Sequence, residues 1–378
     1  MSSEIHPQTN LPNPSRSNPP DSSRKLIFIS LLTLAAAVLI ALFWSDAVNL
    51  SAFRRLFGSS SRAASAVAPL SLSTAATASL AAATTKGRTA SIDNLAESKM
   101  TGKTPIYFFS HGGPNIMYDY DHPAYKKLGQ IGREITSKVK PDAVVVFSAH
   151  WQGGRDTIYV NNAEITELIY DFYGFPDNYY KEKYPNVGSK AVANKVLDAL
   201  KNAGIDAKGT KRGLDHGVWA SFKCAFAPDD NPLNVPIVQV SLFDNEDPVQ
   251  HYKLGQAISH LREQNILIIV SGMAVHNLRD LRFSFGSSRP MPYTVSFDEA
   301  LKEAVTTAPE EREQALVQLL KRPDARQAHP TFDHLLPIHI GAGAAGDDVG
   351  KRLFTYPEGS MSWSQFRFGD LANASTSL

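Results

Sequence analysis

Four apolar runs of strand length, each followed by helix-like spacing, constrain the fold of this 378-residue chain more than any other feature. The runs are rich in Val, Ile and Phe and cover residues 106–110, 143–148, 235–242 and 266–271. Runs of this kind indicate strands that are buried on both faces, as in parallel sheets. Helical periodicity follows them at residues 125–139, 189–203, 253–264 and 297–305. The alternation predicts an α/β fold: a single domain with a mainly parallel central sheet flanked by helices.

The first hundred residues lack this alternation. Residues 1–25 are rich in Pro, Ser and Asn, which predicts a disordered head. Residues 26–44 carry no charge and nearly match the length of about 20 residues that spans a bilayer, which predicts an uncleaved transmembrane anchor. A cleaved signal sequence is the alternative. Residues 45–100 predict a flexible linker, so we expect the catalytic domain at residues 101–378.

The localisation that follows from these segments is a single-pass membrane protein. Arginines lie on both sides of the predicted span, so charge does not decide which side the enzyme faces. Within the linker, residues 51–89 are rich in Ser, Ala and Thr and carry no acidic residue, a composition similar to that of organelle transit peptides, such as those of mitochondria. The compartment and the oligomeric state stay open.

Composition and missing motifs exclude several classes of protein. A net charge of +1 argues against a nucleic-acid partner. Cys224 is the only cysteine, which excludes an intrachain disulfide and a cysteine-based zinc finger. The sequence has no GxGxxG after a strand, no GxxxxGK[ST] loop, no GxSxG elbow and no HExxH helix. The absence of these motifs argues against a dinucleotide-dependent enzyme, a P-loop enzyme and a simple hydrolase.

Three histidines lie at or just beyond the ends of predicted strands: His111, His150 and His276. Because ligands of open α/β sheets bind outside the carboxyl ends of the strands, such residues can converge although they are far apart in sequence. Imidazoles on rigid supports are common metal ligands, and an open coordination position would leave room for water or substrate. The pattern predicts one catalytic metal ion, although each histidine taken alone is more often a hydrogen-bonded or surface residue.

Two further histidines lie in suggestive positions. His216, within GLDHGVW, is expected in a loop from which an acid–base residue could reach a metal-bound substrate. His334 opens an expected short helix in HPTFDHLLP and is a candidate fourth ligand or substrate contact.

The motifs SHGGP, FSAHW, YDFYGFP, LDHGVW, SGMAVHNL and HPTFDHLLP occur in this order over about residues 104–370. They resemble those of the LigB-type class III extradiol ring-cleavage dioxygenases, specifically the 4,5-DOPA extradiol dioxygenase branch. The resemblance implies a non-haem metal enzyme that inserts both atoms of O₂ into a catechol ring beside its hydroxyl groups. It therefore implies a small aromatic substrate and O₂ as partners, with DOPA or a related catechol as the substrate.

The resemblance also implies roles for individual residues. His111, His150 and His276 look like the metal ligands, His334 matches an additional ligand, and His216 matches the acid–base histidine. Five residues look like the loop that lines the substrate pocket: Tyr170, Asp171, Phe172, Gly174 and Phe175. The sequence departs from the family pattern at Phe332 and Asp333, where Pro and Glu are common, and these changes leave the ligands untouched.

The nature of the metal stays open at this point, with one ion per chain expected as Fe(II) or Zn(II). An iron oxygenase usually offers two histidines and one carboxylate, whereas this set reads as histidines only. Zinc suits such a set but has no redox chemistry. The alternative function is therefore a zinc-dependent, non-redox, hydrolase-like enzyme on the same scaffold.

Overall fold

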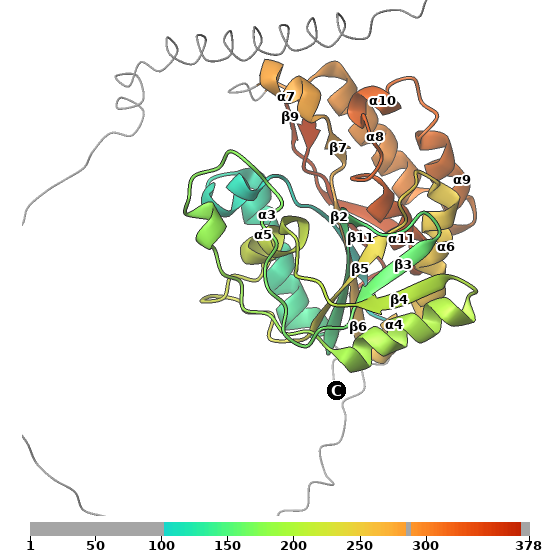
Figure 1. Cartoon of the computed structure of the whole chain (residues 1–378). Helices are drawn as coiled ribbons and strands as arrows, with labels where there is room; N and C mark the ends of the chain where they lie inside the picture. The colour runs from blue at the N-terminus through green and yellow to red at the C-terminus, as the bar shows by residue number, and fades with distance from the viewer. Residues whose placement is uncertain (1–101, 285–288, 372–378) are drawn as a thin grey trace, which may run out of the picture. The chain divides into compact units, whose positions relative to one another are not determined.

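The strands expected from the sequence form the centre of a larger mixed sheet. The computed structural model describes residues 102–284 and 289–371, and in this part of the chain eight strands lie in the order β4, β3, β5, β2, β6, β1, β11, β8 (Figure 1). Their bounds are β1 Ile106–Ser110, β2 Ala143–Gln152, β3 Thr157–Asn161, β4 Asp206–Thr210, β5 Ile237–Leu242, β6 Ile266–Gly272, β8 Gly350–Phe354 and β11 Gln365–Phe368. Strands β5, β2, β6 and β1 pair in parallel, so their carboxyl ends share one edge of the sheet.

Two helical layers bury the two faces of this sheet. Along β1, Ile106 and Phe108 belong to one hydrophobic core, whereas Tyr107 and Phe109 belong to the other. Helices α3 (Pro123–Glu134) and α5 (His216–Ala225) lie on the second side, and α6 (Pro248–Ile258) and α11 (Leu336–Ala345) lie on the first (Figure 1). Burial on both faces explains why the strands read as continuous apolar runs.

The helices expected from the sequence are present, and their ends follow local capping signals. Helix α6 begins at Pro248, earlier than periodicity predicted, because the Asp247 carboxylate accepts hydrogen bonds from the backbone N–H groups of Val249 and Gln250. The remaining helical segments are η1 Pro114–Tyr118, η2 Ile135–Val139, η3 Tyr179–Lys181, α4 Lys190–Asn202, η4 Ser259–Gln264, α7 Leu278–Ser284, α8 Pro292–Thr306, α9 Pro309–Leu319 and α10 Ala325–Ala328.

A small second sheet lies next to the carboxyl edge of the large one. It consists of β7 (Val275–His276), β10 (Met361–Ser362) and β9 (Pro357–Glu358), all paired antiparallel. Apolar periodicity did not predict these strands, because two-residue strands are too short to carry a period.

The expected transmembrane helix requires a correction of the predicted fold class. Nowhere in residues 102–284 and 289–371 does a helix combine the length and the apolar character needed to cross a membrane. The predicted anchor at residues 26–44, with the predicted head and linker on either side of it, lies outside the described residues. The fold class is therefore a mixed α/β domain, without a transmembrane helix among its elements.

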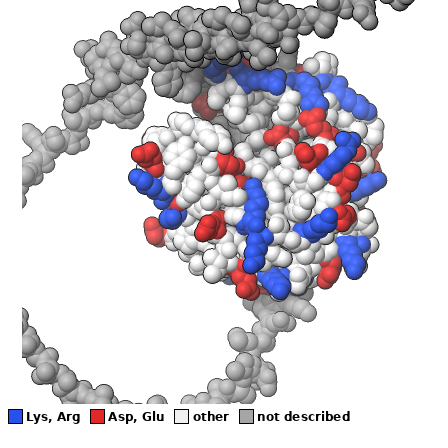
Figure 2. All heavy atoms as spheres, in the orientation of Figure 1, with Lys and Arg blue, Asp and Glu red and all other residues white. Residues whose placement is uncertain are grey.

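Charged side chains of both signs are interspersed on the face of the molecule seen in Figure 2. Lysine and arginine side chains alternate there with aspartate and glutamate, in keeping with the small net charge of the sequence. No single sign of charge dominates the described residues in this view.

Buried histidines in the α6–α11 layer are expected to make the fold sensitive to acid. His251 and His339 are fully buried, and burial lowers the pKa of each to about 4. Between pH 6.5 and 4 the unfolded chain binds more protons than the folded chain, so the free energy of unfolding falls as the pH is lowered. The loss amounts to about 3 kcal/mol for each histidine at the lower end of this interval.

The change His339→Leu is expected to reduce this pH dependence at little cost in stability at pH 7, because the hydrogen bond between its Nε2 atom and the carbonyl of Leu316 is long at 3.4 Å. Urea unfolding at several pH values measures the effect. His260→Gln, a change at an exposed histidine, serves as the control. An unchanged slope in His339→Leu would contradict the assignment.

Candidate metal centre

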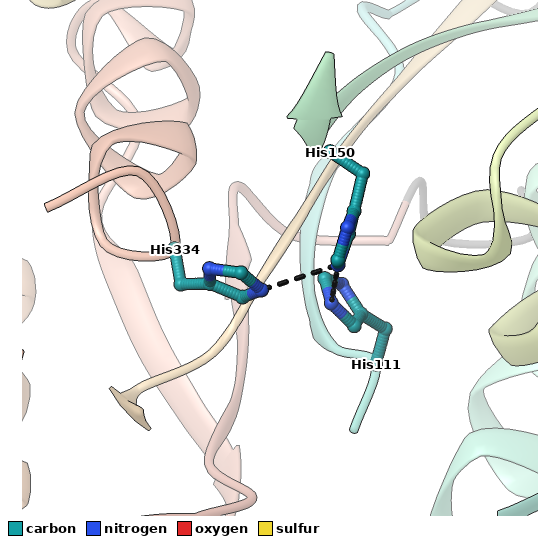
Figure 3. A group of neighbouring side chains, drawn as sticks. All are labelled: His111, His150 and His334. Atoms are coloured by element: carbon teal, nitrogen blue, oxygen red, sulfur yellow. Dashed lines mark hydrogen bonds between the residues drawn. The ribbon is translucent and has the colours of Figure 1, made fainter. Parts of the chain in front are cut away.

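Three histidines from distant parts of the chain meet at the carboxyl edge of the large sheet. His111 directly follows β1, His150 lies near the end of β2, and His334 lies in the turn before α11 (Figure 3). The Nε2 atom of His150 is 3.2 Å from Nε2 of His111 and 3.2 Å from Nε2 of His334. The three rings therefore direct the same nitrogen atom toward one point.

Each of these rings is held from behind through its other nitrogen. The Nδ1 atom of His150 lies 3.1 Å from Asp171 Oδ2, and Nδ1 of His334 lies 2.5 Å from Asp333 Oδ2. A carboxylate accepts a hydrogen bond here, so each Nδ1 carries the proton and each Nε2 keeps its lone pair.

A serine fixes the proton of His111 on Nδ1 in the same way. Its Nδ1 atom is 2.9 Å from Oγ of Ser271, and that hydroxyl donates its hydrogen to the carbonyl of Gly217. The hydroxyl must therefore accept from His111, which leaves the Nε2 lone pair of His111 free. Three lone pairs facing one another without a proton between them constitute a site for a cation.

The spacing of the donors fits a divalent metal ion. Nitrogen ligands at about 2.0–2.1 Å from a tetrahedral metal ion lie roughly 3.3 Å apart, close to the two observed distances. The donor set also leaves further coordination positions for small ligands.

A carboxylate joins this centre to a fourth histidine. Asp171 bonds His150 through Oδ2 and, through Oδ1, lies 2.9 Å from Nδ1 of His216 and 3.0 Å from its backbone nitrogen. His216 is the first residue of α5, where the helix dipole and free N–H groups stabilise a negative charge. Asp171 therefore orients a metal-site histidine and a potential acid–base histidine at once.

Burial and neighbouring charges set the protonation of the cluster. Burial lowers the pKa of His111 well below its usual value, with the neighbouring histidines adding to the shift. Burial also lowers the pKa of His216, against the opposing hydrogen bond to Asp171. Burial raises the pKa of Asp171, but hydrogen bonds from His150 and His216 outweigh it and hold the pKa far below its usual value. At neutral pH the carboxylate is ionised and His216 is neutral.

His150 differs from the other rings because carboxylates surround it. Burial lowers its pKa, but the hydrogen bond to Asp171 and the charge of Asp215 raise it further, so the net shift is upward. A proton and a metal ion compete for this ring, which makes metal binding depend on pH.

Gly217 permits the close approach of α5 to the centre. A Cβ atom at this position would lie 2.7 Å from Oγ of Ser148, 2.8 Å from Cδ2 of His150 and 3.2 Å from Cε1 of His111. A larger residue would displace the rings, so the glycine in LDHGVW is a requirement of the site and not only of a turn.

His276 lies beside the converging trio. Its ring stacks on that of His334, with 3.7 Å between the centroids and 12° between the planes. The group of nitrogen atoms that lie within 4.8 Å of one another contains His111, His150 and His334 but not His276. The structure thus brings together two of the three expected principal ligands and the expected additional one, and a ligand role for His276 stays a prediction.

The expected pocket loop divides into inner and outer residues. Phe172 is buried, with its ring centroid 5.6 Å from that of His216, and Asp171 lies beneath the histidines. Phe175 packs on Phe172, and the Tyr170 hydroxyl donates to the carbonyl of Glu182, farther from the histidines. Gly174, with φ +78°, sits in an open turn. Of this loop, Asp171 and Phe172 contact the centre.

The sequence did not predict that Ser271 would hold His111 or that Asp333 would hold His334. Each lies within a motif that also carries a histidine, yet a single serine or aspartate has no periodic signal. A further buried network was also missed: Asp215 accepts hydrogen bonds from Ser148 and Arg212, and Arg212 donates to the carbonyl of His150. Asp215 thereby secures both β2 and the start of α5.

Comparison with known proteins agrees with this arrangement. The family model described as the catalytic LigB subunit of aromatic ring-opening dioxygenase matches residues 100–366, which include every histidine of the centre. The chain belongs to the LigB family. It is therefore a ring-cleaving dioxygenase, and the motif resemblance noted in the sequence is confirmed.

Several relatives of this LigB protein have names that specify the reaction. A 4,5-DOPA dioxygenase extradiol of Beta vulgaris is 36% identical over 266 residues, which cover 69% of this chain and 95% of that protein. The enzyme of the same name from Escherichia coli K12 is 32% identical and covers 64% of this chain and 85% of its own length. A crystal structure of an uncharacterized E. coli K12 protein matches with a TM-score of 0.57 and 29% identity, covering 71% of this chain and all of that one. These similarities support extradiol cleavage and a small aromatic substrate with O₂.

Proposed function

We propose that this LigB protein opens the aromatic ring of DOPA or a closely related catechol, using one Fe(II) ion. The observation that carries the proposal is the convergence of three Nε2 lone pairs, from His111, His150 and His334, each fixed by a partner on Nδ1. We propose His276 as a further donor, because its ring lies one stacking distance from His334. The names of the relatives support DOPA as the substrate.

The bound metal supplies the electron transfer that reaction with O₂ requires, and zinc has no such chemistry. For this reason we propose iron, although an all-imidazole set also suits zinc. The surrounding residues perform the remaining tasks. Phe172 presents a ring to the substrate side of His216 and helps to exclude water.

His216 is the proposed acid–base residue. Asp171 holds the proton on its Nδ1 atom, so Nε2 is left to accept a proton from a catechol hydroxyl and to return it later. Its lowered pKa keeps the ring neutral and ready to accept at pH 7.

The test is oxygen uptake by protein purified without oxygen and reloaded with a known metal. We expect Fe(II)-loaded protein to consume one O₂ for each DOPA and to form a yellow ring-opened product, and we expect zinc-loaded protein to be inactive. Turnover of DOPA that persists without oxygen and with zinc would favour the non-redox alternative. Metal loading without oxygen uptake on any catechol would contradict the proposal.

A further inference from the structure

The short hairpin of β9 and β10 brings an acidic residue to the rim of the metal centre. In the small sheet, Glu358 pairs with Met361, and Met361 pairs with His276. Residues directly opposite one another on antiparallel strands project to the same face, so the Glu358 side chain lies on the face of His276. Two strand spacings separate the two residues, which amounts to about 10 Å.

The opposite face of the hairpin is anchored elsewhere, which fixes this orientation. Ser362, the neighbour of Met361, donates a hydrogen bond of 2.8 Å to Asp298 on α8. Because Ser362 faces α8, Met361 and Glu358 face the side on which the histidines lie.

His122 holds the Glu358 carboxylate in place. His122 caps α3, where its Nδ1 atom accepts a hydrogen bond from the backbone N–H of Ala124. The proton therefore resides on Nε2, which donates to Oε2 of Glu358 at 3.1 Å. The Glu358 side chain keeps about a third of its surface exposed (35%), and within the described residues its carboxylate forms an ion pair with His122. The carboxylate is thus oriented but accessible.

Trp363 connects this pair with the metal centre. A Cβ atom on Gly112 would lie 1.9 Å from Cη2 of Trp363, so the indole rests on the backbone beside His111. The centroid of the His122 ring is 4.6 Å from that of Trp363 on the way to Glu358. Two aromatic rings therefore form a continuous wall from His111 to the carboxylate.

A catechol that binds the metal through its hydroxyl groups must direct its ring substituent away from the metal. A cationic substituent that reaches the end of the wall meets a carboxylate without a Lys or Arg partner in the described ion pairs. The hydrogen bond from His122 lowers the pKa of Glu358, so the carboxylate is ionised at neutral pH. Hydrogen bonds between charged groups are stronger than neutral ones, and an anionic substituent would be repelled.

We propose that Glu358 is a specificity-determining residue, whose carboxylate binds the ammonium group of catechols that carry an aminoalkyl side chain. The inference rests on the proposed function, because the metal-bound hydroxyl groups set the direction of the side chain.

The experiment compares the wild-type chain with Glu358→Gln on three catechols: dopamine, which is cationic, 4-methylcatechol, which is neutral, and 3,4-dihydroxyphenylacetate, which is anionic. We expect the substitution to lower kcat/KM for dopamine by about tenfold to a hundredfold through KM, as for the loss of a charged hydrogen bond. The neutral catechol should be unaffected, and KM for the anionic catechol should fall. The matched control is Glu299→Gln. Glu299 lies on α8, and its carboxylate pairs with Arg352 and Lys302.

Calorimetric binding of dopamine and 4-methylcatechol without oxygen provides a second measurement that does not need turnover. Equal losses for the cationic and neutral catechols in Glu358→Gln would overturn the inference while leaving the proposed function intact. If Glu358→Gln selectively loses dopamine binding while the wild-type protein cleaves none of the catechols, the subsite would be supported and the proposed function contradicted. Unchanged dopamine binding in Glu358→Gln would overturn the inference outright.

Discussion

Replacement of His150 by alanine is expected to abolish ring cleavage together with metal binding. The Nε2 atom of this residue lies 3.2 Å from those of both His111 and His334, so His150 is the shared neighbour in the trio. Its loss leaves two imidazoles facing each other across an enlarged gap. Loss of residues that merely support a ligand typically costs tenfold to a hundredfold in affinity or activity, so we expect His150→Ala to cost more than about a hundredfold in kcat/KM.

Metal analysis after reconstitution with Fe(II), followed by oxygen uptake, measures this effect. His260→Ala, a change at an exposed histidine, controls for loss of an imidazole elsewhere. Thermal unfolding of the metal-free proteins establishes whether the variant folds. A folded His150→Ala protein that retains a full complement of metal and normal turnover would refute the assignment of the centre.

Replacement of His216 by alanine should separate proton transfer from metal binding. His216 shares Asp171 with His150, and its ring centroid lies 4.1 Å from that of His150, but His216 does not belong to the group of His111, His150 and His334. We therefore expect His216→Ala to bind Fe(II) normally but to lose about a hundredfold to ten-thousandfold in kcat, the range typical of a general acid–base residue. Metal content and kcat, measured on the same preparation, test both parts.

The companion variant Asp171→Asn tests how His216 is positioned. An amide retains the shape but loses the charge that fixes the protons on Nδ1 of His150 and His216, so we expect a smaller loss of about tenfold to a hundredfold. Full kcat in His216→Ala would exclude it as the acid–base group. Loss of metal in His216→Ala would instead indicate that His216 is a metal ligand.

The positions of the candidate metal ligands and of His216, the proposed acid–base residue, indicate why this fold suits the reaction. The parallel strands β1 and β2 end at one edge, which fixes His111 and His150 on rigid supports, while α5 begins at the same edge and presents His216. The aromatic wall that begins at Gly112 supplies a second boundary of the same region. The proposed chemistry and the proposed substrate selection thus lie on neighbouring but separate elements.

Sequence alone predicted the elements that the core dictates. Apolar runs such as 106–110 report burial on two faces, a local property that survives in any fold with two helical layers, and β1 coincides with this run. His111 and His150 were predictable for the same reason, because a residue at the end of a parallel strand has its place fixed by the sheet. The expected transmembrane helix was an inference from residues 26–44 alone, and the fold that the structure describes does not contain one.

Tertiary structure decided which of the remaining groups meet. His276 and His334 both lie within motifs of the family. The path of the turn before α11 places His334 beside His150, whereas the ring of His276 stacks on the ring of His334. The bridge made by Asp171, the serine behind His111 and the pairing of His122 with Glu358 are likewise absent from any sequence period. Periodicity encodes which side chains are buried, whereas contacts between loops depend on how distant segments pack, so only the folded chain determines them.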